Sequence, residues 1–253
     1  MTDETSRRDE LIRRWAELQR RVDAACAAAG RDRAEVTVVA ITKTFPASDV
    51  ALLAELGVRD VGENRDQEAA AKAAACSDLG LRGLRWHFVG QLQTNKARSV
   101  AGYADVVHSV DRVRLVEALD AGAARHERLI DCLVQVDLDP GIETGDAEPD
   151  AARGTEAAPR GGVAPGGAHE VCAAIEDAEH LALAGLMGVA PLGGDPGEAF
   201  ARLFHLRRTL ASTYPRMSVV SAGMTDDLEA AVAHGATHLR VGRALLGSRP
   251  ALR

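Results

Sequence analysis

Short runs of consecutive apolar residues alternate along the chain with longer segments in which apolar residues recur every three or four positions. The clearest run is VTVVAIT at 36–42, where apolar residues follow one another instead of alternating with polar ones. This pattern predicts a strand buried on both faces, which is typical of a parallel sheet covered by helices. Seven more strands are predicted, at 59–61, 86–89, 105–110, 129–136, 181–187, 218–222 and 237–241.

A helical period precedes the first strand and separates each strand from the next. Residues 5–29 place Leu11, Trp15 and Leu18 three or four positions apart, and Gly30 is a suitable helix end. The other predicted helices are 46–57, 65–75, 91–101, 112–124, 169–178, 197–212 and 226–234.

Strict alternation of eight strands with helices predicts an α/β protein that closes into a single (β/α)8 TIM barrel over residues 1–253. Only about eleven residues follow the last strand, so we expect the N-terminal helix to complete the outer ring of helices. An open doubly wound sheet is the alternative. Its dinucleotide-binding fingerprint, G-x-G-x-x-G after the first strand, is missing.

Composition narrows the class of protein. Residues 137–168 are rich in Gly, Pro, Ala and acidic residues, which predicts a long, mobile loop. A net charge of −7 argues against a nucleic-acid partner, and no apolar run is long enough for a membrane span or a signal peptide. The four scattered cysteines form no C-x-x-C pair, which argues against a zinc site and predicts reduced thiols in a cytoplasmic protein.

A lysine stands where the first strand ends. The chain has 27 arginines and only three lysines, Lys43, Lys72 and Lys96. Lys72 and Lys96 lie on predicted helices, where we expect them to be solvated. Lys96 also follows the third strand, so the alternative is that it faces the mouth. Lys43 is either a surface cation or a functional amine, and arginine could not replace it as an amine because a guanidinium does not deprotonate to form a Schiff base.

Two glycine-containing turns follow the seventh and eighth strands, where barrels commonly bind phosphate. SAGMT at 221–225 offers the Ser221 and Thr225 hydroxyls, and VGRALLG at 241–247 offers Gly242 and backbone N–H groups. A lysine and an anion site at one mouth predict a phosphorylated aldehyde, of which pyridoxal 5′-phosphate (PLP) is the obvious example. Arg240 is the candidate partner of its pyridine nitrogen, with a salt-bridged barrel residue as the alternative.

Several motifs together resemble the pyridoxal phosphate homeostasis protein family, in order and spacing over nearly the whole chain. They are AITKTFP (40–46), VGENRDQE (61–68), WHFVGQLQTNKAR (86–98), HSVDR (108–112), GLMGVAP (185–191), SAGMTDDLEAAVAHGATHLRVG (221–242) and LLGSR (245–249).

The resemblance implies a barrel of the alanine racemase N-terminal type, without the C-terminal β-domain, that binds and buffers PLP without enzymatic turnover. It implies a Schiff base on Lys43, Arg240 near the pyridine nitrogen, and Asn64 in the same pocket. The implied phosphate contacts are Ser221, Thr225, Gly242 and Arg243. We include Met224 of the same turn, and His87, for which a core histidine is the alternative.

Some positions depart from the family pattern. Arg243 stands where a small hydroxyl residue is usual, so a guanidinium could contact the phosphate there instead. Residues 137–168 carry no lysine, which puts a loop lysine's part in cofactor transfer in doubt. PLP-dependent apoenzymes are the macromolecular partners that this family suggests, and we expect a monomer.

An amino-acid racemase is the alternative function. Racemisation needs a second acid–base group on the opposite face of the substrate. Related racemases take that group from a further domain or a partner subunit, and the only tyrosines here, Tyr103 and Tyr214, are predicted to lie away from the mouth. A third possibility is a phosphate-binding scaffold that does not use PLP.

Overall fold

Eight parallel strands close into a barrel in sequence order, β1 to β8, in a computed structural model that describes residues 2–139 and 161–247. The strands are β1 (Thr37–Ile41), β2 (Asp60–Glu63), β3 (Arg85–Phe88), β4 (Val106–Val110), β5 (Ile130–Val136), β6 (Leu181–Gly188), β7 (Val219–Ser221) and β8 (His238–Val241). The predicted (β/α)8 barrel is confirmed, and the open sheet is excluded because β1 pairs with both β2 and β8.

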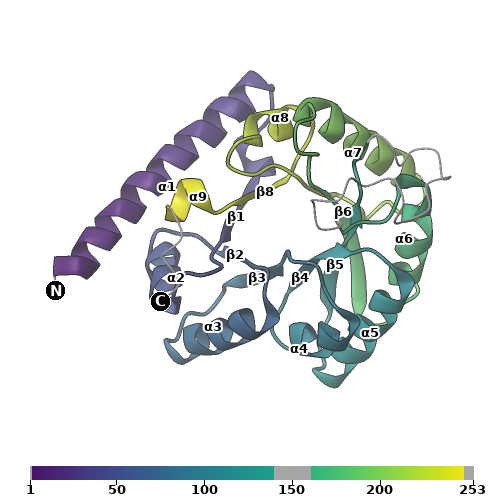
Figure 1. Cartoon of the computed structure of the whole chain (residues 1–253), viewed down its shortest axis with the longest axis horizontal. Helices are drawn as coiled ribbons and strands as arrows, with labels where there is room; N and C mark the ends of the chain where they lie inside the picture. The colour runs from purple at the N-terminus through teal and green to yellow at the C-terminus, as the bar shows by residue number, and fades with distance from the viewer. Residues whose placement is uncertain (1, 140–160, 248–253) are drawn as a thin grey trace.

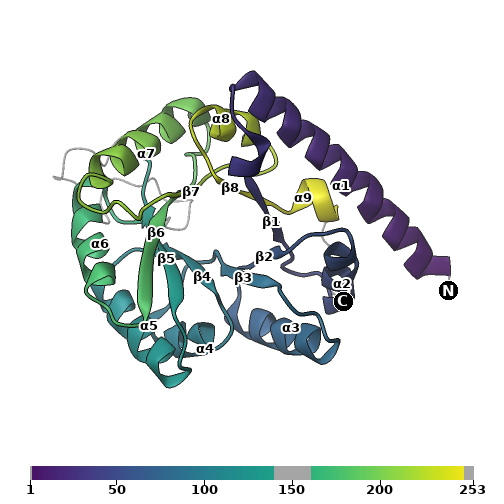
Figure 2. The ribbon, with the colours of Figure 1, turned by 180° about the vertical axis from the view of Figure 1, so that it is seen from behind.

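Helices surround the barrel on its outside (Figures 1 and 2). They are α1 (Thr2–Ala28), α2 (Ala47–Glu55), α3 (Asp66–Asp78), α4 (Ala97–Ala101), α5 (Val113–Arg125), α6 (Ala168–Glu176), α7 (Pro196–Leu210), α8 (Leu228–Ala233) and α9 (Arg243–Leu246), with 3-10 helices η1 (Arg33–Glu35), η2 (Thr94–Lys96) and η4 (Pro165–Gly167). As expected, α1 completes the ring, since it packs against α2, α8 and α9.

The helix predicted at 91–101 is shorter than expected. Gln93 is extended, with φ −73° and ψ 138°, so the helical backbone begins only at η2 and continues as α4. The predicted loop 137–168 falls largely on residues 140–160, outside the described residues. Of the part that is described, Val163 pairs with Val136 as an isolated parallel bridge.

Most apolar side chains lie between the strands and the helices. Val38 and Ala40 of β1 belong to this large aliphatic core, which also includes Leu11 and Leu18 of α1. The other side of each strand faces the barrel interior, because successive side chains along a strand point in opposite directions. A small apolar cluster of Val106, Leu133 and Met187 is separate from the main core.

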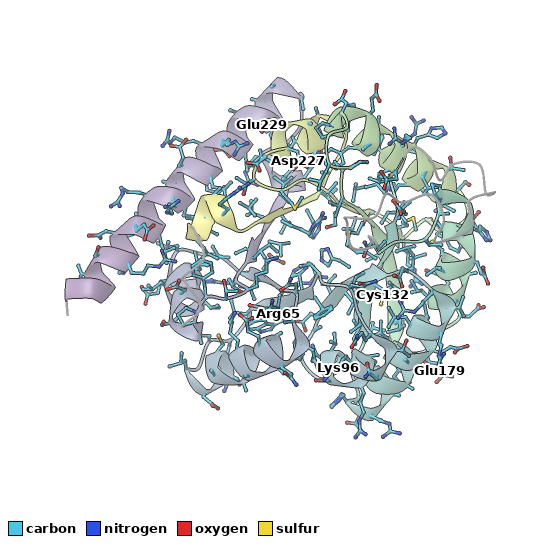
Figure 3. The ribbon with its side chains drawn as sticks, in the orientation of Figure 1. Arg65, Lys96, Cys132, Glu179, Asp227 and Glu229 are labelled. Carbon is cyan, nitrogen blue, oxygen red and sulfur yellow. The ribbon has the colours of Figure 1, made fainter. Side chains whose placement is uncertain are left out.

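Surface ion pairs connect some of the helices, such as α1 and α8. Glu229 of α8, labelled in Figure 3, accepts hydrogen bonds from the Arg21 guanidinium of α1. The start of α7 is defined locally, because Asp195 accepts a hydrogen bond from the Gly197 N–H at 2.8 Å and Pro196 takes the first helical position.

Within residues 2–139 and 161–247, no helix combines the length and apolar character needed to cross a membrane.

Candidate functional site

A cavity of ≈ 670 Å³ lies where the strands end. All eight strands are parallel, so their C-terminal ends meet at one mouth of the barrel. The cavity has an apolar part formed by Ile41, Phe45, Val89, Met187 and Val189. Its lining also includes seven of the residues singled out from the sequence, which are Lys43, Asn64, Met224, Thr225, Arg240, Gly242 and Arg243.

Lys43 reaches this cavity from a tight turn after β1. The Phe45 N–H donates to the Thr42 carbonyl at 3.0 Å and closes the turn. Thr44 has a φ of 70°, a left-handed conformation that β-branched residues rarely adopt. The turn redirects the backbone directly after the strand, and the half-buried Lys43 side chain lines the mouth.

Arg240 of β8 is buried at the same mouth. Its Nη1 donates to the Ser221 hydroxyl at 2.7 Å, and its Nη2 donates to the Gly188 carbonyl at 2.9 Å. Both acceptors are neutral, and no carboxylate within residues 2–139 and 161–247 forms an ion pair with it. Burial lowers the pKa of Arg240 to about 10, which still leaves the guanidinium charged at neutral pH. Since a guanidinium has five N–H donors, some remain for a ligand in the cavity.

Two of the residues predicted from the sequence, Ser221 and His87, do not line the cavity. They belong to a buried hydrogen-bonded chain beneath Arg240. The Ser221 Oγ lies 2.9 Å from His108 Nδ1, His108 Nε2 lies 2.8 Å from His87 Nδ1, and His87 Nε2 lies 2.9 Å from an oxygen of Asp60. We call these five side chains, from Asp60 to Arg240, the interior polar chain.

Burial lowers the pKa of both imidazoles, that of His108 well below its ordinary value, so each is neutral and carries a single N–H. The carboxylate of Asp60 at one end then fixes the direction of every hydrogen bond in the interior polar chain. Asp60 can only accept, so His87 Nε2 carries hydrogen and its Nδ1 accepts from His108 Nε2. His108 Nδ1 then accepts from the Ser221 hydroxyl, which in turn accepts from Arg240. The ring centroid of His238 lies 6.1 Å from that of His87. We call His87, His108 and His238 the interior histidines.

The loops after β7 and β8 form another part of the cavity wall. Thr225 Oγ1 accepts from the Ala244 N–H at 3.3 Å, which joins the two loops. Gly242 lies close to β1, because a Cβ there would be 3.3 Å from the Ile41 carbonyl oxygen. Arg243 pairs with Asp226, and both side chains are mostly exposed. Met224 is 40% exposed at this rim.

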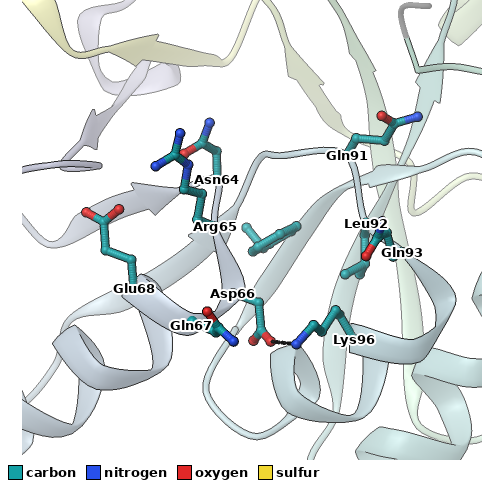
Figure 4. Close-up of a pocket in the computed structure, with 10 residues that line it drawn as sticks. Asn64, Arg65, Asp66, Gln67, Glu68, Gln91, Leu92, Gln93 and Lys96 are labelled. Atoms are coloured by element: carbon teal, nitrogen blue, oxygen red, sulfur yellow. Dashed lines mark ion pairs between the residues drawn. The ribbon is translucent and has the colours of Figure 1, made fainter.

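Asn64 separates this cavity from a neighbouring pocket, which Figure 4 shows with Arg65, Gln91 and Lys96 around it. The Asn64 Oδ1 atom is buried and has no hydrogen-bond partner among the described residues. Gly90 packs directly on the Asn64 backbone, since a Cβ there would meet the Asn64 carbonyl oxygen at 2.3 Å. An orphaned buried acceptor at a cavity wall is suited to a ligand hydroxyl or N–H group.

Lys72 is buried, so the prediction that it is solvated was wrong. Its Nζ donates to the Thr42 carbonyl at 2.7 Å, to Glu63 Oε1 at 2.5 Å and to Glu68 Oε1 at 3.1 Å. Burial raises the pKa of the Glu63 carboxyl, against the opposing effect of the hydrogen bonds from Lys72 and Thr42. The rarity of lysine, which drew attention to Lys43, applied equally to Lys72 and could have identified it.

The lining residues fit a phosphorylated aldehyde such as PLP, because they offer an amine on Lys43, a buried guanidinium on Arg240, and the Thr225 hydroxyl together with Gly242. Neither tyrosine and none of the four cysteines lines it. In the described part of the chain, no group of three or more His, Cys, Asp or Glu side chains is placed to hold a metal ion.

Comparisons with known proteins found relatives over most of the chain. The model of the alanine racemase N-terminal domain matches residues 14–250. A pyridoxal phosphate homeostasis protein of Mycobacterium bovis is 45% identical over 96% of this chain and 94% of its own length. One from Escherichia coli is 31% identical over 95% of this chain and 97% of its own. The structure of PipY of Synechococcus elongatus with PLP bound superposes with a TM-score of 0.72, at 33% identity, over 84% of this chain and 93% of that one.

Proposed function

Since the chain belongs to the pyridoxal phosphate homeostasis protein family, a group of barrels of the alanine racemase N-terminal type, we propose that it binds PLP at the mouth of the barrel. There it holds the cofactor as a Schiff base on Lys43 and takes part in the homeostasis of vitamin B6. The observation that carries the proposal is the cavity itself, which brings Lys43, Arg240 and Thr225 together from three separate strand ends.

Arg240 has a defined part in this proposal. PLP supplies a reactive aldehyde and a conjugated ring when it is bound. Arg240 donates a hydrogen bond to the pyridine nitrogen, and as a permanent cation it leaves that nitrogen without a proton. An unprotonated ring is a weaker electron sink. The arrangement therefore favours holding the cofactor over chemistry that needs a stabilised carbanion.

The phosphate is proposed to lie against Thr225, Gly242 and the backbone of Arg243, with Met224 at the exposed rim. The guanidinium of Arg243 already pairs with Asp226, so a phosphate there would compete with a carboxylate. We assign Ser221 and His87 a supporting part, because the Ser221 hydroxyl already donates to His108 and accepts from Arg240. Asn64 is proposed to bond the ring hydroxyl of PLP with its orphaned Oδ1.

We further propose that the protein is a non-catalytic carrier and a monomer that supplies PLP-dependent apoenzymes. The support for the non-catalytic assignment is the lining of the cavity. A racemase needs a second acid–base group, and the lining includes no tyrosine, cysteine or histidine. The interior histidines lie beneath the cavity, and two of them already use both ring nitrogens in the interior polar chain.

The test uses the fact that the chain has only three lysines. The protein is mixed with PLP, reduced with borohydride and digested, and the pyridoxyl group is located by mass spectrometry. We expect the label on Lys43, a visible absorption band in the wild type and in Lys96→Met, and no band in Lys43→Ala. A wild type that takes up no PLP would leave only an anion-binding barrel.

A second measurement separates carrier from enzyme. The PLP-loaded protein is incubated with L-amino acids, and the enantiomers are resolved by chiral chromatography. We expect no conversion above that of free PLP. Turnover that disappears in Lys43→Ala would overturn the carrier assignment and favour a racemase. Recovery of activity by an apoenzyme on mixing tests the transfer, and the mass in solution tests the monomer.

A further inference from the structure

The buried side chains of Glu63 and Lys72 and the partly exposed side chain of Glu68 lie behind the turn that presents Lys43. We call them the α3 cluster, because Glu68 and Lys72 are on α3 and Glu63 ends β2 beside it. Lys72 is 6% exposed and Glu63 is 0% exposed. An ammonium group has three N–H donors, and here each one has an acceptor: the Thr42 carbonyl, Glu63 and Glu68. All the hydrogen-bonding capacity of Lys72 is therefore used inside the protein.

Two contacts of the α3 cluster reach the backbone on either side of Lys43. Lys72 Nζ donates to the carbonyl of Thr42 at 2.7 Å, and Glu68 Oε1 accepts from the N–H of Thr44. The same Glu68 oxygen also accepts from Lys72, so the two contacts share one network. The peptide groups before and after Lys43 are thus both held from behind, while its side chain lines the cavity in front.

This support is needed because the turn is unfavourable by itself. Thr44 has a positive φ, which costs a β-branched residue free energy and persists only where surrounding contacts maintain it. Thr42 adds a third connection, because its hydroxyl donates to Glu63 Oε1 at 2.7 Å. Without the α3 cluster, the turn would relax toward ordinary backbone angles and move the Lys43 Cα–Cβ bond away from the cavity.

We propose that Lys72 and Glu68 are positioning residues that hold the Lys43 amine at the aldehyde of the bound cofactor, an inference that rests on the proposed function. Neither residue lines the cavity. They act through the backbone of 42–44. Their loss changes how readily Lys43 forms its covalent bond and leaves the non-covalent part of the site unchanged.

The test separates covalent from non-covalent binding with two ligands. PLP reports Schiff base formation through its visible band, whereas pyridoxine 5′-phosphate has an alcohol in place of the aldehyde and reports the rest of the pocket. The variants are Lys72→Met and Glu68→Ala. The matched controls are Lys96→Met, which removes a partly exposed lysine, and Gln67→Ala, an exposed position of α3 next to Glu68.

We expect Lys72→Met and Glu68→Ala to lower the rate of Schiff base formation on the order of tenfold or more, as misplacement of a reacting group does. Their affinity for pyridoxine 5′-phosphate should stay within about twofold of the wild-type affinity. Both controls should match the wild type with both ligands.

Each result decides between the hypotheses. If both variants form the Schiff base as fast as the wild type, the positioning role is refuted while the proposed function stands. If affinity for both ligands falls equally, the α3 cluster only maintains the fold, and the inference is also refuted. If the wild type forms no Schiff base on Lys43, the proposed function itself fails. Lys72→Met leaves the buried Glu63 carboxylate without its cation, which could itself destabilise the protein. The double variant Glu63→Gln/Lys72→Met therefore repeats the test with neither charge of this buried pair. Glu68→Ala repeats it at a partly exposed side chain.

Discussion

Replacing Ser221 by alanine tests the interior polar chain directly. The Ser221 hydroxyl is fully buried, donates to His108 Nδ1 at 2.9 Å and accepts from Arg240 Nη1 at 2.7 Å. Alanine fits the same space but removes both interactions. It therefore leaves a buried imidazole acceptor and a buried guanidinium donor without partners.

The expected loss of stability follows from those two groups. Leaving a buried polar group unsatisfied costs about 1–3 kcal/mol, and more when the group is charged, so we expect Ser221→Ala to lower the free energy of unfolding by about 3 kcal/mol. In a protein of this size, each kcal/mol lowers the melting temperature by about 2–4 °C, which gives a decrease of about 6–12 °C. Urea and thermal unfolding of the ligand-free protein, followed by circular dichroism, measure both quantities.

Ser109 of β4 is the matched control. It is as deeply buried as Ser221, but its hydroxyl has no hydrogen-bond partner among the described residues. Removing that hydroxyl breaks no hydrogen bond within the described residues, so Ser109→Ala should change the free energy of unfolding by less than about 1 kcal/mol. Equal stabilities of the two variants would refute the hydrogen-bond assignments in the interior polar chain.

Three other predictions concern packing, pH and thiol reactivity. Gly90→Ala should prevent normal folding, because its Cβ would lie 2.3 Å from the Asn64 carbonyl oxygen, whereas Gly166→Ala, with no atom within 4 Å, should melt like the wild type. Burial lowers the pKa values of the interior histidines, that of His238 to about 4, so the unfolded chain binds more protons below pH 6.5. The contribution of these histidines to the free energy of unfolding is complete above about pH 6.5 and is lost toward pH 4, by up to about 1.4 kcal/mol per histidine for each pH unit. Urea unfolding at pH 7.5 and at pH 5.5 measures this loss, and equal stabilities at the two pH values would contradict it. All four cysteines are buried, and burial raises the pKa of the Cys172 thiol to about 12, so a thiol reagent should label none in the native protein and all four in urea.

The sequence alone determined the order of strands and helices and identified seven residues of the cavity lining. Lys43, Arg240 and Gly242 could be assigned to one mouth because the ends of parallel strands in a closed barrel are neighbours, whatever the details of packing. Local sequence carries that information, since continuous apolar runs define the strands and the residue after each run occupies the mouth. Both Lys43 and Gly242 were found in this way.

Only the tertiary structure determined what lies behind the mouth. The interior polar chain joins residues of β2, β3, β4, β7 and β8, and the α3 cluster joins Glu63 and Lys72 to the turn after β1. These contacts depend on which face of each strand a side chain occupies and on the register between strands, which no local pattern specifies. Lys72 lies on an alanine-rich helix, so its sequence context predicts a solvated side chain. The fold instead places the buried Glu63 carboxylate and the Thr42 carbonyl against its ammonium group. The physical reason is that strand and helix periods are local properties, whereas the pairing of buried polar groups is decided between segments far apart in the chain.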